Sequence, residues 1–87
     1  MHERALMRDL LEEIERVARS ERARRVLRVE VRLGALSHFT EDHFREPFED
    51  ASRGTVAENA IVVATVARDV SEPDAAGVVL ESVEVER

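Results

Sequence analysis

The N-terminal part of the chain carries an apolar stripe that strongly constrains how the chain can fold. Between residues 5 and 18, apolar side chains recur in steps of three and four, which places them on one face of an α-helix. The stripe consists of Leu6, Met7, Leu10, Leu11, Ile14, Val17 and Ala18. The other face is charged, and Glu12–Arg16 and Glu15–Arg19 have the i,i+4 spacing of stabilising ion pairs. The segment therefore predicts an amphipathic helix that buries one face against another element.

The next pattern is a strict alternation, which is typical of a β-strand with one buried and one solvated face. In the sequence RVLRVEVRLG, the predicted buried residues are Leu27, Val29, Val31 and Leu33. We expect them to pack against Leu6, Leu10, Ile14 and Val17 of the helix. The opposite face carries Arg28, Glu30 and Arg32. That face is either a surface for a partner or simply a solvated side of the sheet.

The segment after this strand predicts a second helix with a proline inside it. Thr40 precedes two acidic residues, as expected for an N-cap followed by a first turn that complements the helix dipole. Phe44 and Phe48 are four residues apart and can both face the core. Pro47 removes a backbone hydrogen bond, so we expect either a kinked helix or a short turn with a helix restarting at the preceding residue. Gly54 is the expected C-terminal stop.

The remaining segments complete a small α+β fold. Two β-branched stretches, NAIVVATVAR and VVLESVEVE, predict strands joined by the turn-like sequence DVSEPDAAG. At 87 residues the chain has room for one domain, with the element order α-β-α-β-β. We expect two helices on one face of a three-stranded sheet. The last two strands should be antiparallel, and the helical crossover allows the first two to be parallel, so the sheet is predicted to be mixed.

The parity of the last strand is informative. Val78 and Leu80 occupy even positions, whereas Val83 and Val85 occupy odd ones. A regular strand cannot bury both pairs on one face. Either a β-bulge near Glu81–Ser82 brings them to the same side, or the two halves of the strand are buried on alternate faces.

Composition excludes several classes of function. The net charge is −6 and every basic residue is an arginine, which argues against non-specific binding to nucleic acid. The absence of cysteine excludes disulfides, thiolate zinc sites and cysteine nucleophiles. No apolar stretch has the length of a membrane span or the form of a signal peptide, so we expect a cytoplasmic protein. Since no nucleophile grouping, P-loop or dinucleotide fingerprint is present, we do not expect an enzyme.

Three histidines are the candidate metal ligands. His2 lies next to the terminal amine of Met1, so amine, backbone amides and imidazole can reach one ion. Square-planar nitrogen coordination suits Ni(II) or Cu(II), and the alternative is a solvated terminal residue. His38 and His43 lie around the predicted start of the second helix. They can bind a metal together, or His43 can simply solvate the first turn.

Four strings of the sequence resemble one known family. They are MHE at the start, ARRVLRVEVRLGALS at 23–37, FED and RGTVAEN within 48–59, and LESVEVE at 80–86. Together they resemble the HypA/HybF family of nickel chaperones for [NiFe]-hydrogenase maturation. The resemblance extends nearly from end to end, and its most specific parts are the terminal Met-His-Glu and the Arg-Gly-Thr-x-Ala-Glu string.

The resemblance implies a nickel-binding domain of two helices and a three-stranded sheet. It implies Ni(II) held at the N-terminus by the Met1 amine and by His2 as the essential side-chain ligand, with Glu3 assisting. It also implies partnership with a HypB-type GTPase and delivery of nickel to the hydrogenase large subunit, or to urease in some organisms. Members of the family are not enzymes.

The chain departs from the family pattern in three places. Family members insert a zinc domain with two CxxC pairs between the last two strands, whereas residues 69–77 stand there in this chain. We therefore expect a single nickel-binding domain over residues 1–87, without zinc. The family's helix start of Pro then Glu is replaced by Glu41 and Asp42, and its Ala-Glu-Gly has become AEN. Asn59 suits that position, since asparagine tolerates the left-handed conformation.

Two functions are compatible with these residues. The first is a minimal nickel metallochaperone for hydrogenase maturation that binds Ni(II) at its N-terminus. The second is a HypA-like adaptor that binds protein partners and has lost metal delivery with the zinc domain. The retained MHE favours the first, because an adaptor would have little need for it.

Overall fold

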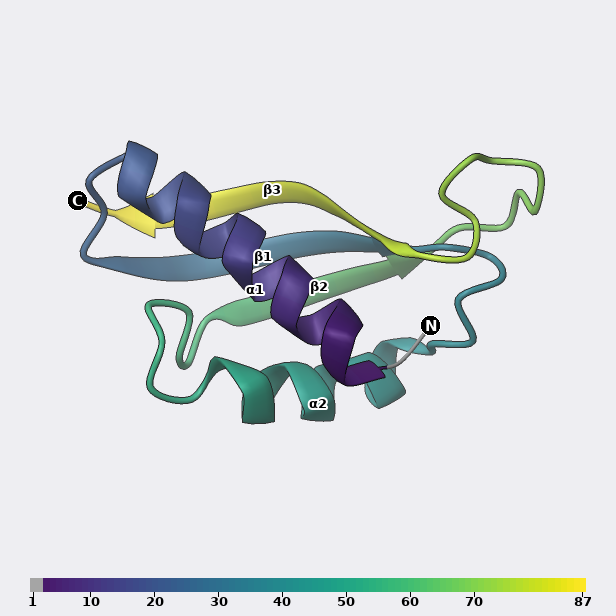
Figure 1. The fold of residues 1–87 in the computed structure, drawn as a ribbon, viewed down its shortest axis with the longest axis horizontal. Helices are drawn as coiled ribbons and strands as arrows, with labels where there is room; N and C mark the ends of the chain where they lie inside the picture. Colours follow the sequence, from purple (N-terminus) through teal and green to yellow (C-terminus); the bar gives the residue numbers. More distant parts are fainter. Residues whose placement is uncertain (1–2) are drawn as a thin grey trace.

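The elements follow the predicted order. The computed structural model describes residues 3–87. Figure 1 shows α1 lying across the front of the sheet and α2 lying along its β2 side. The predicted α+β fold with two helices and a mixed three-stranded sheet is confirmed. The elements are α1 (Glu3–Ser20), β1 (Arg25–Leu33), α2 (Glu41–Ser52), β2 (Ile61–Val66) and β3 (Val78–Glu86).

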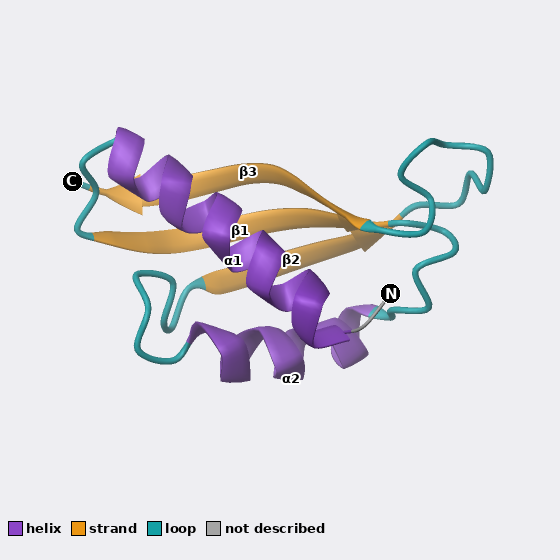
Figure 2. Ribbon diagram, in the orientation of Figure 1, coloured by secondary structure: helices purple, strands orange, loops and turns teal. Residues whose placement is uncertain are grey.

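The sheet has β1 in its centre, with strand order β2-β1-β3 (Figure 2). β1 pairs with β2 in parallel, since the α2 crossover returns the chain to the same end of the sheet. β1 pairs with β3 antiparallel. The last two strands therefore run in opposite directions, as expected, but they are not neighbours, because the 67–77 loop carries the chain past β1.

A β-bulge in β3 brings its even-numbered and odd-numbered apolar residues to the same face of the sheet. Ser82 lies opposite Glu30 and Leu80 lies opposite Val31, so Glu81 is an extra residue on β3. The valines on both sides of the bulge, together with Leu80, pack against the core. The prediction of a bulge near Glu81–Ser82 is thus confirmed, and burial on alternate faces is excluded.

A second irregularity on β1 was not predicted. Val85 lies opposite Val26 and Glu84 lies opposite Arg28, so Leu27 has no partner on β3. Because this extra residue shifts the parity of β1, Val26 is buried and Leu27 is only half-buried. The prediction that Leu27 belongs to the buried set was therefore wrong.

The core lies between the two helices and one face of the sheet. Most of the predicted α1 stripe is buried, but Val17 is only half-buried, since it lies at the edge of the stripe near the end of α1. Neither Glu12–Arg16 nor Glu15–Arg19 forms an ion pair within 4.0 Å among the described residues. The fully buried side chains at the centre of the core are Ile14, Val26, Val29, Val31, Leu33, Phe44 and Phe48.

The second helix is continuous through its proline. The hydroxyl of Thr40 accepts a hydrogen bond from the His43 amide at 3.1 Å, which confirms the predicted N-cap. α2 runs without interruption from Glu41 to Ser52, so the alternative of a helix restarting next to Pro47 was wrong. The physical reason is the anchoring of Phe44 and Phe48, which are buried on both sides of the proline with ring centroids 5.8 Å apart.

In the described part of the chain, no helix combines the length and apolarity needed to cross a membrane.

Candidate metal site at the start of α1

The predicted N-terminal nickel ligands directly precede or begin α1 in the sequence. Met1 and His2 lie outside the described residues, and Glu3 is the first residue of the helix, with an exposed side chain. The first amides of a helix have no carbonyl partner within it. The backbone N–H of Glu3 is therefore not committed to the helical hydrogen-bond ladder, and it can serve a ligand bound at the N-terminus.

Glu3 lies where three surface grooves meet. The first, which we call the acidic groove, has a volume of about 460 Å³ and runs along the start of α2. The second, of about 680 Å³, lies between the 36–39 loop and the 73–77 loop. The third, which we call the helix groove, has a volume of about 550 Å³ and separates α1 from α2. The start of α1 is therefore open on several sides.

The acidic groove collects both remaining candidate histidines. Its charged and imidazole side chains are Glu3, His38, Asp42, His43, Glu46 and Asp50. Among the described residues, four carboxylates and no arginine line this groove, so its field favours a cation. The α2 carboxylates are not among the predicted ligands, although their i,i+4 spacing at positions 42, 46 and 50 is the signal that marks a common helix face.

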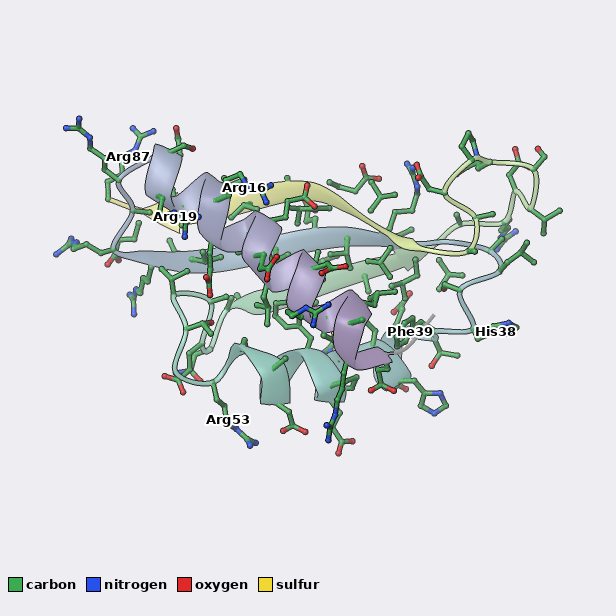
Figure 3. All side chains as sticks on the ribbon, viewed as in Figure 1. Arg16, Arg19, His38, Phe39, Arg53 and Arg87 are labelled. Atoms are coloured by element: carbon green, nitrogen blue, oxygen red, sulfur yellow. The ribbon has the colours of Figure 1, made fainter. Side chains whose placement is uncertain are left out.

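His38 and His43 line the same groove but do not form a closed site. His38 has a positive φ of 66°, and its side chain points outward from the loop in Figure 3. Phe39 turns inward instead, where its ring meets that of Phe44 edge-on at 5.6 Å. Within residues 3–87, no group of three or more histidine or acidic side chains is close enough to hold a metal ion. Metal binding by this histidine pair therefore stays a prediction.

The segment that contains the Arg-Gly-Thr string differs from the start of α1, because its polar atoms form hydrogen bonds within the chain. The Thr55 hydroxyl donates to the Ser52 carbonyl at 2.7 Å and accepts from the Ala57 amide at 3.1 Å. The Glu58 carboxylate accepts from the amide of Gly54 at 3.3 Å. We call residues 52–59 the clasp. It ends α2 with internal hydrogen bonds.

The clasp also positions the first residues of β1. The Val56 carbonyl accepts a hydrogen bond from the Val26 amide at 2.9 Å, and Ala57 is fully buried beside it. Gly54 and Asn59 have positive φ angles of 77° and 66°. Gly54 follows the end of α2, as predicted for a stop, and the expected left-handed conformation of Asn59 is confirmed.

The charged outer face of the sheet is neutralised within the chain. Arg28 lies 3.5 Å from Glu30, and Arg32 lies 3.1 Å from Glu81. The hydrogen bond from the Ser82 hydroxyl, helped by the Arg28 charge, holds the pKa of Glu30 below its usual value. Since these charges have partners in the chain, the described geometry favours a solvated face over a partner surface.

Comparison with known proteins decides the family. A sequence profile described as "Hydrogenase/urease nickel incorporation, metallochaperone, hypA" matches residues 1–72. The chain belongs to the HypA family. The matched region includes the start of α1, the acidic groove residues of α2 and the clasp, and it ends in the loop between β2 and β3.

Individual relatives agree with this assignment. The chain is 42% identical over 60 residues to the hydrogenase maturation factor HypA of Rhodopseudomonas palustris (strain BisB5). That match covers 69% of this chain and 53% of the relative, so the chain spans about half the length of the curated relative it matches.

Two solved structures share the fold. One is the solution structure of the Ni metallochaperone HypA from Helicobacter pylori, with a TM-score of 0.81 and 20% sequence identity over 99% of this chain and 98% of that chain. The other is a solution structure of a HypA protein, with a TM-score of 0.73 and 21% identity over 98% and 96% of the two chains. At these identities the likeness concerns the fold.

Proposed function

We propose that this chain is a nickel-binding accessory protein for [NiFe]-hydrogenase maturation. In this proposal Ni(II) is cargo, bound at the N-terminus by the Met1 amine, the His2 imidazole and the backbone and carboxylate of Glu3. The observation that carries the proposal is the match to a nickel-incorporation family from residue 1 onward, which includes Met-His-Glu. We infer that the chain transfers nickel rather than catalysing a reaction.

The start of α1 supplies suitable chemistry for this cargo. Amine, imidazole and amide nitrogens are the donors that a square-planar Ni(II) site requires. Because α1 begins at Glu3, the first backbone amides carry no intrahelical hydrogen bond that nickel binding would have to break. The acidic groove beside Glu3 raises the local concentration of cations.

The two further histidines have a secondary place in this proposal. His38 and His43 line the acidic groove together with Glu3, so they can approach an ion held at the N-terminus. We rank them below His2 because the loop and helix that carry them do not bring three ligands together within residues 3–87.

The partners are proposed by family. We propose a HypB-type GTPase and the hydrogenase large subunit as the proteins that this chain contacts. We also propose that the loop between β2 and β3, at residues 69–77, takes the place of the family's zinc domain and that the chain works as one nickel-binding domain over residues 1–87 without zinc. Metal handling then depends on the helix–sheet domain alone.

Calorimetric titration of Ni(II) into the untagged chain tests the proposal. We expect binding of one ion, and His2→Ala should lower the affinity by about tenfold or more, which is about 1.4 kcal/mol. A His38→Ala/His43→Ala double variant is the control, and it should lose less affinity than His2→Ala. Equal affinity of wild type and His2→Ala would remove the N-terminal site.

The same experiment separates the adaptor alternative. If the wild-type chain binds no nickel but forms a stable complex with a HypB-type GTPase in a pull-down, the chain is an adaptor without metal delivery. Nickel binding that depends on His2 excludes this alternative.

A further inference from the structure

The end of the molecule where α1 and β3 finish gathers positive charge. The joint after α1 lies beside the end of β3, since the Arg24 amide donates a hydrogen bond to the Glu86 carbonyl at 2.7 Å. Figure 3 shows Arg16, Arg19 and Arg87 at this end of the molecule. We call the exposed arginines here the basic end, which consists of Arg16, Arg19, Arg22, Arg24, Arg25 and Arg87.

Two carboxylates pair with half of these arginines. Arg24 and Arg25 share the carboxylate of Glu86, at 3.9 Å and 3.2 Å. Arg87 pairs with Glu21. These pairs are exposed, so solvent weakens them and leaves the guanidinium groups accessible.

The other three arginines of the basic end have no such partner. Arg16, Arg19 and Arg22 form no ion pair within 4.0 Å among the described residues. Residues 16–25 and 84–87 together contain six arginines and three glutamates, although the chain as a whole has a net charge of −6. The basic end is therefore a local surplus of positive charge on an acidic protein.

Arg22 is held in a backbone conformation that favours glycine. α1 ends in a Schellman motif, in which the Ala23 amide donates to the Ala18 carbonyl at 2.9 Å and the Arg22 amide donates to the Arg19 carbonyl at 3.1 Å. Arg22 has a φ of 53° at the position of this motif that glycine usually occupies. Arg19 in the last turn already complements the helix dipole. The arginine at position 22 thus introduces strain without an ion pair in return, and such residues are concentrated at functional sites.

We infer that the basic end is the docking surface for an acidic segment of a partner protein. A guanidinium group binds a carboxylate through two parallel hydrogen bonds, so a segment rich in Asp or Glu complements this surface. The inference does not depend on the nickel site. α1 has 18 residues, which separates Glu3 from the basic end by about 27 Å at 1.5 Å per residue.

The aromatic residues favour a protein partner over RNA. Surfaces that bind single-stranded RNA combine basic side chains with aromatic rings on which the bases stack. The chain has no Trp or Tyr, Phe44 and Phe48 are buried, and Phe39 packs edge-on against Phe44. A long polyanion would also extend from the basic end onto a chain that is acidic as a whole, so a short acidic segment fits better.

Fluorescence anisotropy with a short fluorescein-labelled oligoglutamate peptide tests the inference, with EDTA present to remove metal. We expect the wild-type chain to bind the peptide at about 50 mM NaCl and to release it at about 500 mM NaCl, because salt screens exposed pairs. A labelled oligouridylate of equal charge should bind more weakly. Absence of peptide binding in low salt would overturn the inference, and tighter binding of the oligouridylate would overturn the choice of a protein partner.

Arg22→Gly separates docking from folding. We expect it to weaken peptide binding by about threefold, and Arg19→Gln combined with Arg22→Gly should weaken it by about tenfold. Since glycine relieves the strain at position 22, Arg22→Gly should not lower the midpoint of urea denaturation. Arg45→Gln makes the same charge change at an exposed position on the first half of α2, and it should lose less affinity than Arg22→Gly.

Three results of this comparison would overturn the assignment of the surface. The first is wild-type peptide affinity in Arg22→Gly. The second is a lower unfolding midpoint in Arg22→Gly, which would mean that the arginine serves the fold. The third is equal loss of affinity in Arg45→Gln and Arg22→Gly, which would mean that the peptide responds to net charge alone.

Discussion

The start of α1 and the clasp both belong to the strings that resemble HypA, yet the chain uses them differently. In the clasp, the Thr55 hydroxyl and the Glu58 carboxylate are bonded to neighbouring backbone, and Ala57 is fully buried. At the start of α1, Glu3 is exposed and its carboxylate has no ion pair within 4.0 Å among the described residues. One segment is committed to the fold, and the other is free to bind a ligand.

This difference separates two kinds of family signature. A substitution in a segment whose polar atoms are satisfied internally should lower stability and leave metal binding unchanged. A substitution in a segment whose donor atoms have no partner in the fold should weaken metal binding and leave stability unchanged. Unfolding and nickel affinity measured on the same variant test this division.

The largest expected effect on stability comes from the core under α2. Phe44→Ala removes a fully buried ring that contacts both Phe39 and Phe48. We expect it to lower the free energy of unfolding by about 3–5 kcal/mol, measured by urea denaturation. Because Phe44 belongs to the core and not to the proposed nickel site, the variant that is still folded at low temperature should have the nickel affinity of the wild type. A loss below about 1 kcal/mol would mean that the packing described here is wrong.

The clasp itself is tested by Thr55→Ala. This variant removes the hydrogen bond to the Ser52 carbonyl and the one from the Ala57 amide. We expect a loss of about 1–2 kcal/mol in the free energy of unfolding, with no change in nickel affinity. Thr65→Ala, an exposed position on β2, is the matched control and should change stability by less than about 0.5 kcal/mol. If Thr55→Ala weakened nickel binding without loss of stability, the clasp would have a binding role.

The left-handed residue of the clasp gives a finer test. Asn59→Ala should lower the free energy of unfolding by about 1 kcal/mol, because alanine tolerates a φ of 66° poorly. Asn59→Gly should be close to neutral, since glycine adopts this conformation readily. Thermal denaturation of the two variants compares them directly, and equal losses would show that backbone conformation is not the reason for asparagine here.

The smallest expected effect lies on the outer face of the sheet. Ser82→Ala removes the hydroxyl that hydrogen-bonds to Glu30 and should raise the pKa of that carboxyl towards its usual value, as followed by NMR titration. Since the pKa of Glu30 is lowered in the folded chain, its contribution to stability is present above the unfolded pKa. That contribution is lost as the pH falls through the folded pKa. Ser71→Ala is a control of the same type beside Asp69, and it should leave Glu30 unchanged.

Hydrophobic patterning together with cap and turn residues predicted the order of the helices and strands, and parity reduced the last strand to two alternatives, of which the structure shows the bulge at Glu81. The second bulge was missed because Leu27 continues the alternation of β1 without interruption, so no local signal marks the extra residue. Local rules left open whether α2 runs through Pro47 or restarts beside it, and the burial of Phe44 and Phe48 on both sides of the proline favours the continuous helix.

The candidate site was predictable in part. The proposed N-terminal ligands were named from the sequence, His2 because it lies next to the terminal amine and Glu3 because the family resemblance implies it, and they stay a prediction. The acidic groove could not, because it depends on the packing of α2 and the 36–39 loop around Glu3. Residues far apart in sequence meet there only once the core has formed.

The most direct test of the division uses the single primary amine that the sequence contains. The chain has no lysine, so selective acetylation modifies the α-amine of Met1 alone, and mass spectrometry confirms a single acetyl group. Nickel titration and urea denaturation are then carried out on the acetylated and unmodified chains. We predict that acetylation lowers nickel affinity by about tenfold or more and leaves the unfolding midpoint unchanged. Equal nickel affinity of the two chains would contradict an N-terminal site.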